Sequence, residues 1–194
     1  MKKHGFSIWN LMRLSLGVMV ICGLLYPLAV TAVGQGLFNK QADGSLVYNS
    51  EGKVIGSELI GQSFDEPGYF HSRVSSINYD AAGSGSPNYA PSNPNLIERT
   101  IQDTERWSEQ NPEVSIEDLP NDLVTNSASG LDPHISPEAA LSQVPRVAEF
   151  TGINEKTLEN LIETHTQEPS MGIFGSPGVN VLMLNLAIDE KRTP

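Results

Sequence analysis

The sequence has a single cysteine and few basic residues, and each shortage argues against a class of protein. Cys22 alone cannot close an intrachain disulfide, and it cannot supply a cysteine-based zinc site or a redox pair. The 194 residues include 12 Lys or Arg against 23 Asp or Glu, which gives a net charge of −11. Nucleic-acid binding needs clustered Lys and Arg to neutralise phosphates, so this composition argues against a nucleic-acid partner.

The sequence also lacks the motifs of common nucleotide-binding and catalytic sites. It has no Gly-rich phosphate loop ending in Gly-Lys-Ser/Thr, no GxGxxG, no HExxH and no GxSxG. Its own motifs therefore do not indicate that this chain binds a nucleotide, and we expect no catalytic residues in it.

An uncharged apolar run covers residues 14–33, LSLGVMVICGLLYPLAVTAV. As a helix this run is about 30 Å long, which matches the hydrocarbon core of a bilayer. A cleaved signal peptide is the alternative, but its apolar core normally has only about 7–15 residues, so a retained anchor is favoured. One helix cannot enclose an ion path, so any role in transport requires partner subunits.

The charges around this run predict its orientation in a cell membrane. Lys2, Lys3 and Arg13 precede it without any acidic residue, and the rest of the chain holds nine bases and all 23 acids, a net charge of −14. The positive-inside rule therefore places the N-terminus in the cytoplasm. The predicted organisation is a cytoplasmic N-terminus, a transmembrane helix and an extracytoplasmic domain, at residues 1–13, 14–33 and 34–194.

Strand patterns occur near both ends of the predicted outer domain. Residues 46–48 and 53–60 are rich in strand-forming residues and flank a hairpin turn at residues 49–52. Residues 179–188, VNVLMLNLAI, are apolar on both alternating faces, which predicts a central strand buried on both sides. Residues 80–94 are thick in Gly, Ser, Asn and Pro and predict an extended loop.

Helix patterns fill the rest of this domain. Three helix starts share a capping residue, followed in two cases by proline: Asn93-Pro94, Ser136-Pro137 and Asn154. Leu96, Ile97 and Ile101 mark one face of the first helix, and Pro145 should kink or stop the second. Because helices and strands do not alternate regularly, the sequence predicts an α+β domain with one sheet layer packed by helices.

Asp132 and His134 are the residues most suggestive of chemistry. With His71 they would offer ligands for a metal, and with Ser129 or Ser136 they have the residue types of a hydrolase. We favour a structured turn in which Asp132 binds local backbone amides and Ser136 caps a helix. Catalytic triads are normally assembled from distant segments, so we predict neither a metal site nor a triad here.

Two other groups of residues suggest contacts with a partner. Residues 69–73, YFHSR, form either a strand with aromatic side chains in the core or a patch that faces a partner. Gln143 and Arg146 share a helix face beside Pro145, where a local ion pair or a surface role is the alternative.

Six segments, taken in order after the anchor, resemble the KdpC family, the small subunits of Kdp-type potassium-transporting P-type ATPases. They are GSELIGQSF at 56–64, PGYFHSR at 67–73, APSNPNL at 90–96, DLVTNSASGLDPHISPEAA at 122–140, QVPRVA at 143–148 and GIFGSPGVNVLMLNLAI at 172–188. The match spans almost the whole chain. Val74 stands where the family usually has Pro, residues 86–89 replace a more Gly-rich stretch, and Asn126 and Ala128 alter the segment before Ser129.

The resemblance implies a non-catalytic accessory subunit in a bacterial plasma-membrane complex for high-affinity potassium uptake. Its partners would be a channel-like potassium-binding subunit and an ATP-hydrolysing subunit, and its role that of a catalytic chaperone that raises ATP affinity. ATP and potassium would belong to the complex, with no cofactor bound by this chain alone. The alternatives are a membrane-anchored extracytoplasmic hydrolase that uses Asp132 and His134, or an anchored solute-binding module.

The family also implies a nucleotide contact around the helix that carries Gln143. The predicted topology places Gln143 outside the membrane, about 30 Å of hydrocarbon away from cytoplasmic ATP. We therefore favour assembly together with long-range coupling, typically about 1–3 kcal/mol, through the anchor helix. The residues expected to contact partners or to act in the chaperone role are Phe70, His71, Arg73, Ser92, Asn93, Asp132, His134, Gln143 and Arg146.

Overall fold

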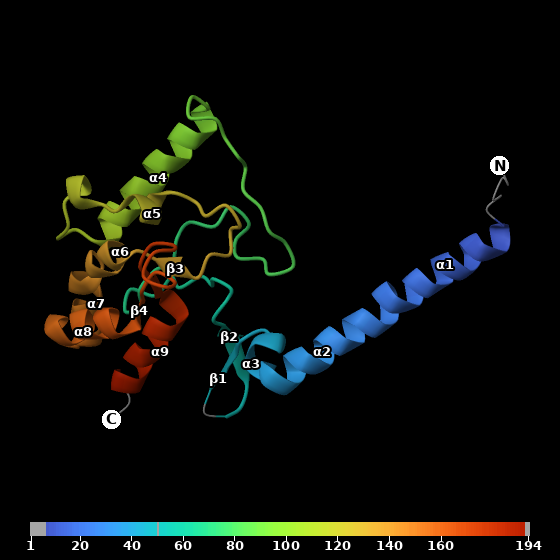
Figure 1. The fold of residues 1–194 in the computed structure, drawn as a ribbon. Helices are drawn as coiled ribbons and strands as arrows, with labels where there is room; N and C mark the ends of the chain where they lie inside the picture. The colour runs from blue at the N-terminus through green and yellow to red at the C-terminus, as the bar shows by residue number, and fades with distance from the viewer. Residues whose placement is uncertain (1–6, 50, 193–194) are drawn as a thin grey trace. The chain divides into compact units, whose positions relative to one another are not determined.

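The computed structural model describes residues 7–49 and 51–192, which form two compact units divided at Leu46. In the first unit, α1 (Ile8–Val20), a π-helical turn η1 (Ile21–Leu25) and α2 (Tyr26–Leu37) follow one another as a continuous helix (Figure 1). This helix has the length and composition to cross a membrane, and it contains the predicted span 14–33. Residues 1–6, with Lys2 and Lys3, lie outside the described residues.

A π-helical turn is found immediately before Pro27 in this helix. Proline has no N–H, and its ring clashes with the carbonyl four residues earlier in a regular α-helix. The backbone N–H of Tyr26 bonds to the carbonyl of Ile21, which is the wider spacing of a π turn and accommodates the proline. Pro27 thus modifies the helix without ending it.

The hairpin predicted around residues 49–52 is confirmed. After the short helix α3 (Asn39–Ala42), strand β1 (Leu46–Tyr48) pairs with β2 (Val54–Ser57). The Asn49 side chain accepts hydrogen bonds from the backbone N–H groups of Glu51 and Lys53, and this holds the turn. β2 ends at Ser57, earlier than the predicted residue 60.

The C-terminal domain, from Val47 onward, is a mixture of helices around a small sheet, which confirms the predicted α+β class. Its further elements are α4 (Pro94–Gln110), the 3-10 turn η2 (Ile116–Asp118), α5 (Asn121–Val124), β3 (His134–Ile135), α6 (Pro137–Leu141), α7 (Val144–Thr151), α8 (Glu155–His165), β4 (Thr166–Gln167), β5 (Gly178–Asn180) and α9 (Val181–Arg192). The sheet is antiparallel in the order β3-β5-β4, with Ile135 and Thr166 both paired to Val179. Helices α6 to α9 gather around it, and α4 lies at one end (Figure 1).

The helix starts were predicted correctly because their signals are local. Asn93, Ser136 and Asn154 each accept a hydrogen bond from a backbone N–H in the first turn of α4, α6 and α8, respectively. Pro145 lies in the first turn of α7, so the predicted interruption separates α6 from α7. The face of α4 marked by Ile97 and Ile101 is not the one that the helix buries, since both are 52% exposed.

The predicted terminal strand over residues 179–188 is wrong for most of its length. Only Gly178–Asn180 is strand, central in the sheet as predicted, and helix α9 begins at Val181. An apolar run buried on all sides has the same pattern in a strand and in a helix, so periodicity could not separate them. The overlooked signal is Asn180, whose side chain accepts the N–H of Met183 and caps α9.

Candidate functional site

Residues 67–73, which we call the strap, begin in a turn at 67–69 and continue without regular secondary structure, and Phe70 is fully buried in the core. Two amide side chains provide the hydrogen bonds that a strand partner would make. Asn185 of α9 accepts the N–H of Phe70 at 2.8 Å and donates to its carbonyl at 2.9 Å. Gln143 accepts the N–H of His71 at 2.8 Å and donates to its carbonyl at 3.2 Å. The backbone N–H and carbonyl groups of Phe70 and His71 are thereby satisfied.

Arg146 of α7 fastens the beginning of the strap. Its side chain donates to the carbonyls of Pro67 and Tyr69, to Asn111 at 3.0 Å and to Gln143 at 2.7 Å. Arg146 is only 5% exposed, and the acceptors that the described residues give its guanidinium are neutral oxygens. Burial lowers its pKa to about 10, so it stays charged at neutral pH. Because only neutral hydrogen-bond acceptors among the described residues compensate this buried charge, the loss of any of them should destabilise the fold.

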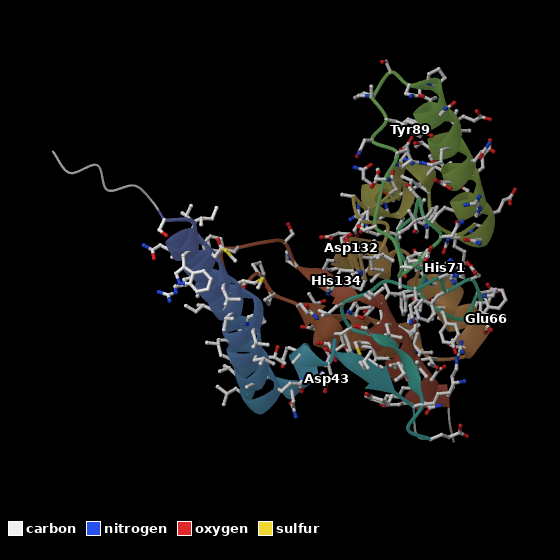
Figure 2. The ribbon with its side chains drawn as sticks, turned by 90° about the vertical axis from the view of Figure 1, so that its right-hand side faces the viewer. Asp43, Glu66, His71, Tyr89, Asp132 and His134 are labelled. Atoms are coloured by element: carbon white, nitrogen blue, oxygen red, sulfur yellow. The ribbon has the colours of Figure 1, made fainter. Side chains whose placement is uncertain are left out.

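His71 lies at the strap's outer side, with Nε2 3.2 Å from the carbonyl of Glu66 (Figure 2). Burial and the charge of Arg146 lower the pKa of His71 to about 4. The ring is therefore neutral at physiological pH, and an Nε2–H tautomer donates to that carbonyl.

The lowered pKa of His71 predicts acid sensitivity. Between pH 6.5 and about 4 the unfolded chain binds a proton that the folded chain does not, so the free energy of unfolding falls as the pH falls through this window. We expect the loss attributable to His71 to be roughly 2 kcal/mol, allowing for its partial exposure. Urea unfolding at pH 7 and at pH 4.5 should show a smaller loss in His71→Gln than in the parent chain. Equal losses in the two chains would contradict the assignment to His71.

Arg73, Asp132 and His134 form a second cluster. Arg73 donates to Asp132 at 2.9 Å, and Asp132 accepts the backbone N–H of His134 at 3.0 Å. Burial by itself would raise the pKa of Asp132, but the hydrogen bonds from His134 and Arg73 outweigh it and hold the pKa at about 2. Asp132 thus shapes the turn before α6, as predicted.

Among the described residues, Ser136 is engaged in a helix cap and forms no hydrogen bond with His134. The Ser136 hydroxyl donates to Asp122 at 3.1 Å while accepting the N–H of Ala139, so it serves the cap of α6. Figure 2 places His71 beside Glu66 and apart from Asp132 and His134. Within residues 7–49 and 51–192, no group of three His, Cys, Asp or Glu is arranged to hold a metal.

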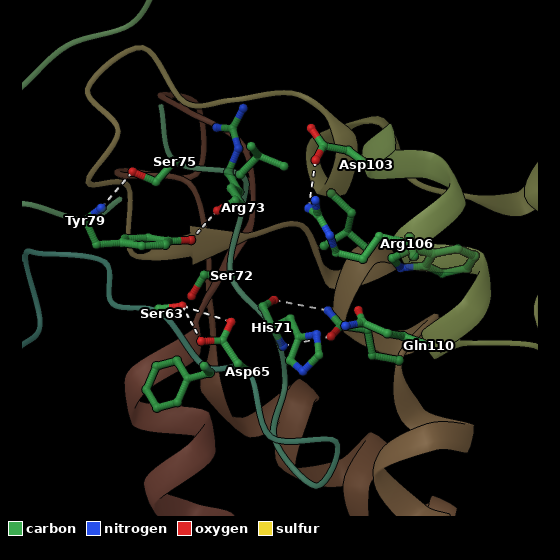
Figure 3. Close-up of a pocket in the computed structure, with 15 residues that line it drawn as sticks. Ser63, Asp65, His71, Ser72, Arg73, Ser75, Tyr79, Asp103, Arg106 and Gln110 are labelled. Atoms are coloured by element: carbon green, nitrogen blue, oxygen red, sulfur yellow. Dashed lines mark hydrogen bonds and ion pairs between the residues drawn. The ribbon is translucent and has the colours of Figure 1, made fainter. Parts of the chain in front are cut away.

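A cavity of about 230 Å³ lies between the strap and α4 (Figure 3). His71 and Arg73 line one side of it, and Asp103, Arg106 and Gln110 of α4 line the other. A second cavity, of about 350 Å³, is lined by Arg73, Asp132 and His134 and by residues of the β4–β5 hairpin. Arg73 borders both cavities and is the one member of the strap that connects the two clusters.

The nine residues predicted for partner contact or the chaperone role therefore fall into three places. Phe70, His71, Gln143 and Arg146 share the buried network, and Arg73, Asp132 and His134 form the second cluster. Ser92 is exposed, and Asn93 caps α4 next to it.

Sequence reasoning missed Asn185 and Asn111, which complete the network around the strap. The sequence offers one signal for Asn185, namely a polar amide inside an otherwise apolar run. Such a residue requires buried partners.

Comparison with known proteins agrees with the order of motifs along the chain. A family model described as "KdpC: K+-transporting ATPase, c chain" matches residues 8–190. The potassium-transporting ATPase KdpC subunit of Bacillus anthracis is 52% identical over 190 residues, which cover 98% of each chain. The KdpC subunit of Bacillus thuringiensis subsp. konkukian is 52% identical over 180 residues, 93% of each chain, and that of Bacillus cereus strain ATCC 14579 is 50% identical over 190 residues, 98% of each chain.

Proposed function

This chain belongs to the KdpC family, the c chains of K+-transporting ATPases, and from this membership we propose that it stabilises the assembly of such a complex and raises the ATP affinity of the subunit that hydrolyses ATP. The chain is a subunit of the complex, not a standalone enzyme. Its partners in the proposal are a channel-like potassium-binding subunit and an ATP-hydrolysing subunit. The observation that carries the proposal is near-complete coverage by the family together with the apolar helix at residues 8–37, the one helix among the described residues that is long and apolar enough to cross a membrane.

The anchor helix supports the assembly role. Every large apolar side chain from Ile8 to Leu37 is exposed in the isolated chain. These side chains therefore require lipid or other membrane helices as neighbours. In the proposal, the N-terminus is cytoplasmic, the C-terminal domain lies outside the cell membrane, and this domain docks on the potassium-binding subunit.

The buried network supports an indirect effect on ATP. Gln143 is 1% exposed and Arg146 is 5% exposed, and their polar atoms hold the strap. Side chains engaged in this way influence a distant site through the shape of the domain and its contacts. The ATP affinity would then respond through coupling of about 1–3 kcal/mol transmitted by the anchor and partner helices.

Purification of the tagged full-length chain in mild detergent tests the proposal. We expect two large multi-span proteins to accompany it, and the eluate to hydrolyse ATP faster when potassium is added. Recovery of the chain alone, from cells confirmed to express such an ATPase, would contradict stable assembly. If the other subunits, purified without this chain, hydrolyse ATP with the same ATP affinity as the complete complex, the chaperone role is contradicted.

Replacing residues 14–33 with an unrelated apolar helix of equal length tests whether the anchor packs on partner helices. Membrane helices associate through close side-chain packing that a generic apolar sequence does not reproduce. We therefore expect the recovery of partners to fall several-fold while the chain stays in the membrane fraction. Full recovery of the partners would show that the anchor acts only as a tether.

A further inference from the structure

The hairpin between β4 and β5 exposes three large apolar side chains within four residues. Met171 is 89% exposed, Ile173 79% and Phe174 66%. These are the largest exposed fractions among the large hydrophobic residues described in the C-terminal domain. We call residues 169–175 the apolar tip. Burial against some neighbour is the usual fate of such a cluster, because isolated exposed hydrophobics are common but contiguous ones are not.

The apolar tip is an ordered structure. Ser170 and Phe174 exchange backbone hydrogen bonds at 2.8 and 3.0 Å, and the N–H of Gly172 donates to the carbonyl of Pro169 at 2.8 Å. Met171 holds a left-handed backbone conformation, with φ of 57°, that is unfavourable for a residue with a side chain. Backbone groups satisfied in this way are a precondition for entering an apolar medium, where no water replaces a missing hydrogen bond.

The apolar tip is also uncharged in a strongly acidic domain. No charged residue occurs between Glu168 and Asp189, although residues 34–194 carry a net charge of −14. Charged side chains resist transfer toward hydrocarbon, and this stretch of the chain presents none. The exposed side chains are aliphatic, thioether and phenyl, and large apolar side chains of this kind are the ones that interfacial membrane elements bury.

The tether keeps the domain close to a bilayer. Residues 38–46 connect the end of α2 to the C-terminal domain, and fully extended they would reach roughly 30 Å. Part of this length is the helix α3, which shortens the reach. A domain of this size has a radius of gyration of about 15 Å. Whatever orientation the domain adopts, its surface therefore stays within reach of the membrane that holds the anchor.

From these observations we propose that Met171, Ile173 and Phe174 insert into the interfacial region of the lipid bilayer, as a second membrane contact beside the anchor helix. The expected depth is that of interfacial elements, about 5–10 Å at the boundary of headgroups and acyl chains. The contact restricts the rotation of the C-terminal domain about its tether and presents a defined face to partner subunits. This inference rests on the proposed anchoring of the chain by residues 8–37.

Fluorescence quenching in vesicles tests this contact. The full chain with Cys22→Ala and Ile173→Cys is labelled with an environment-sensitive fluorophore and reconstituted alone into phosphatidylcholine vesicles that contain spin-labelled lipid. The matched control carries Cys22→Ala and Ile116→Cys, at an isoleucine that is 56% exposed beside Glu117 and Asp118. We expect several-fold stronger quenching and a blue-shifted emission at position 173, with equal circular dichroism in both variants.

The outcomes separate the possible neighbours of the apolar tip. Equal and weak quenching at positions 173 and 116 overturns the proposal. A blue shift at position 173 that appears only after the other subunits are added, without lipid quenching, assigns the tip to a partner protein and also overturns it. The native Cys22, labelled in the unmodified chain, reports on the anchor separately. Its failure to be quenched would contradict the anchoring by residues 8–37, and not the tip alone.

Discussion

Replacing Arg146 with alanine is expected to lower the free energy of unfolding by about 4 kcal/mol, because several buried acceptors lose their donor at once. The carbonyls of Pro67 and Tyr69 and the side-chain oxygens of Asn111 and Gln143 all point to this guanidinium. Removal of a buried charge offsets part of this loss of stability. The acceptors left without a donor in the buried site account for the remainder. Urea unfolding of the full chain in detergent, followed by circular dichroism, measures the effect.

Arg106→Ala is the matched control. The Arg106 side chain is 63% exposed and pairs with Asp103 at 2.9 Å, and Arg99 remains 3.8 Å from the same carboxylate, so the removal of Arg106 should cost less than about 1 kcal/mol. Arg146→Lys should lie between the two, since an ammonium keeps the charge but cannot reproduce the forked geometry of a guanidinium. An Arg146→Ala chain as stable as Arg106→Ala would contradict the role assigned to the network.

In the assembled ATPase, the effect of Arg146 on ATP affinity has to be separated from its effect on the stability of the domain. Arg146→Ala should reduce the ATP affinity of the complex if coupling passes through the network, but the same change destabilises the domain. Arg146→Lys should keep more of the domain's stability and is therefore the better variant for measuring ATP affinity. Unchanged affinity in a complex that contains the lysine variant would remove Arg146 from the residues proposed to influence ATP.

The second large effect is expected for Asn185→Ala, at about 3 kcal/mol, because the N–H and the carbonyl of Phe70 both become unsatisfied in the core. Asn185 is 2% exposed and forms both hydrogen bonds through its amide group. Asn185→Asp keeps the acceptor but loses the donor and buries a charge, so it should also be destabilising. Thermal and urea unfolding of the full chain measure both variants.

Asn160→Ala supplies the comparison for Asn185→Ala. Asn160 is exposed on α8, and alanine is a better helix former than asparagine, so this chain should be as stable as the parent or slightly more stable. A similar free energy of unfolding for the two alanine variants would show that the strap does not depend on the amide of Asn185.

The parts of this protein that were predicted well are those whose determinants lie within a few residues. The anchor follows from an uncharged run, and the helix starts follow from Asn93, Ser136 and Asn154, each of which bonds to a backbone N–H within three positions. The turn around Asn49 and the interruption at Pro145 have equally local causes. The family could likewise be identified, because the order of six motifs is a property of the chain itself.

For residues 179–188, the local sequence was not sufficient to predict the secondary structure. Their composition determined that they are buried, and it left open whether the backbone is a strand or a helix. Packing decides it. In α9, Val181, Leu184, Asn185 and Ile188 share a buried face at helical spacing, and Asn180 ends the strand by capping the helix.

The sequence predicted some residues of the candidate site but not the contacts that they form. Phe70, His71, Gln143 and Arg146 were among the nine residues predicted to contact a partner or to act in the chaperone role. In the fold they hold the strap to α7 and α9, and their role in the complex remains a prediction.

The apolar N-terminal helix, the capped helices, the acidic charge and the family could be derived from the amino-acid sequence, because each depends on composition or on neighbours along the chain. The folded domain was needed to show that the amide of Asn185 bonds to Phe70, 115 positions away, and that Gln143 bonds to His71, 72 positions away. It was also needed to show that Met171, Ile173 and Phe174 stay exposed. A side chain's hydrogen-bond partners and its access to solvent depend on which distant segments fold against it, and local sequence carries no record of them.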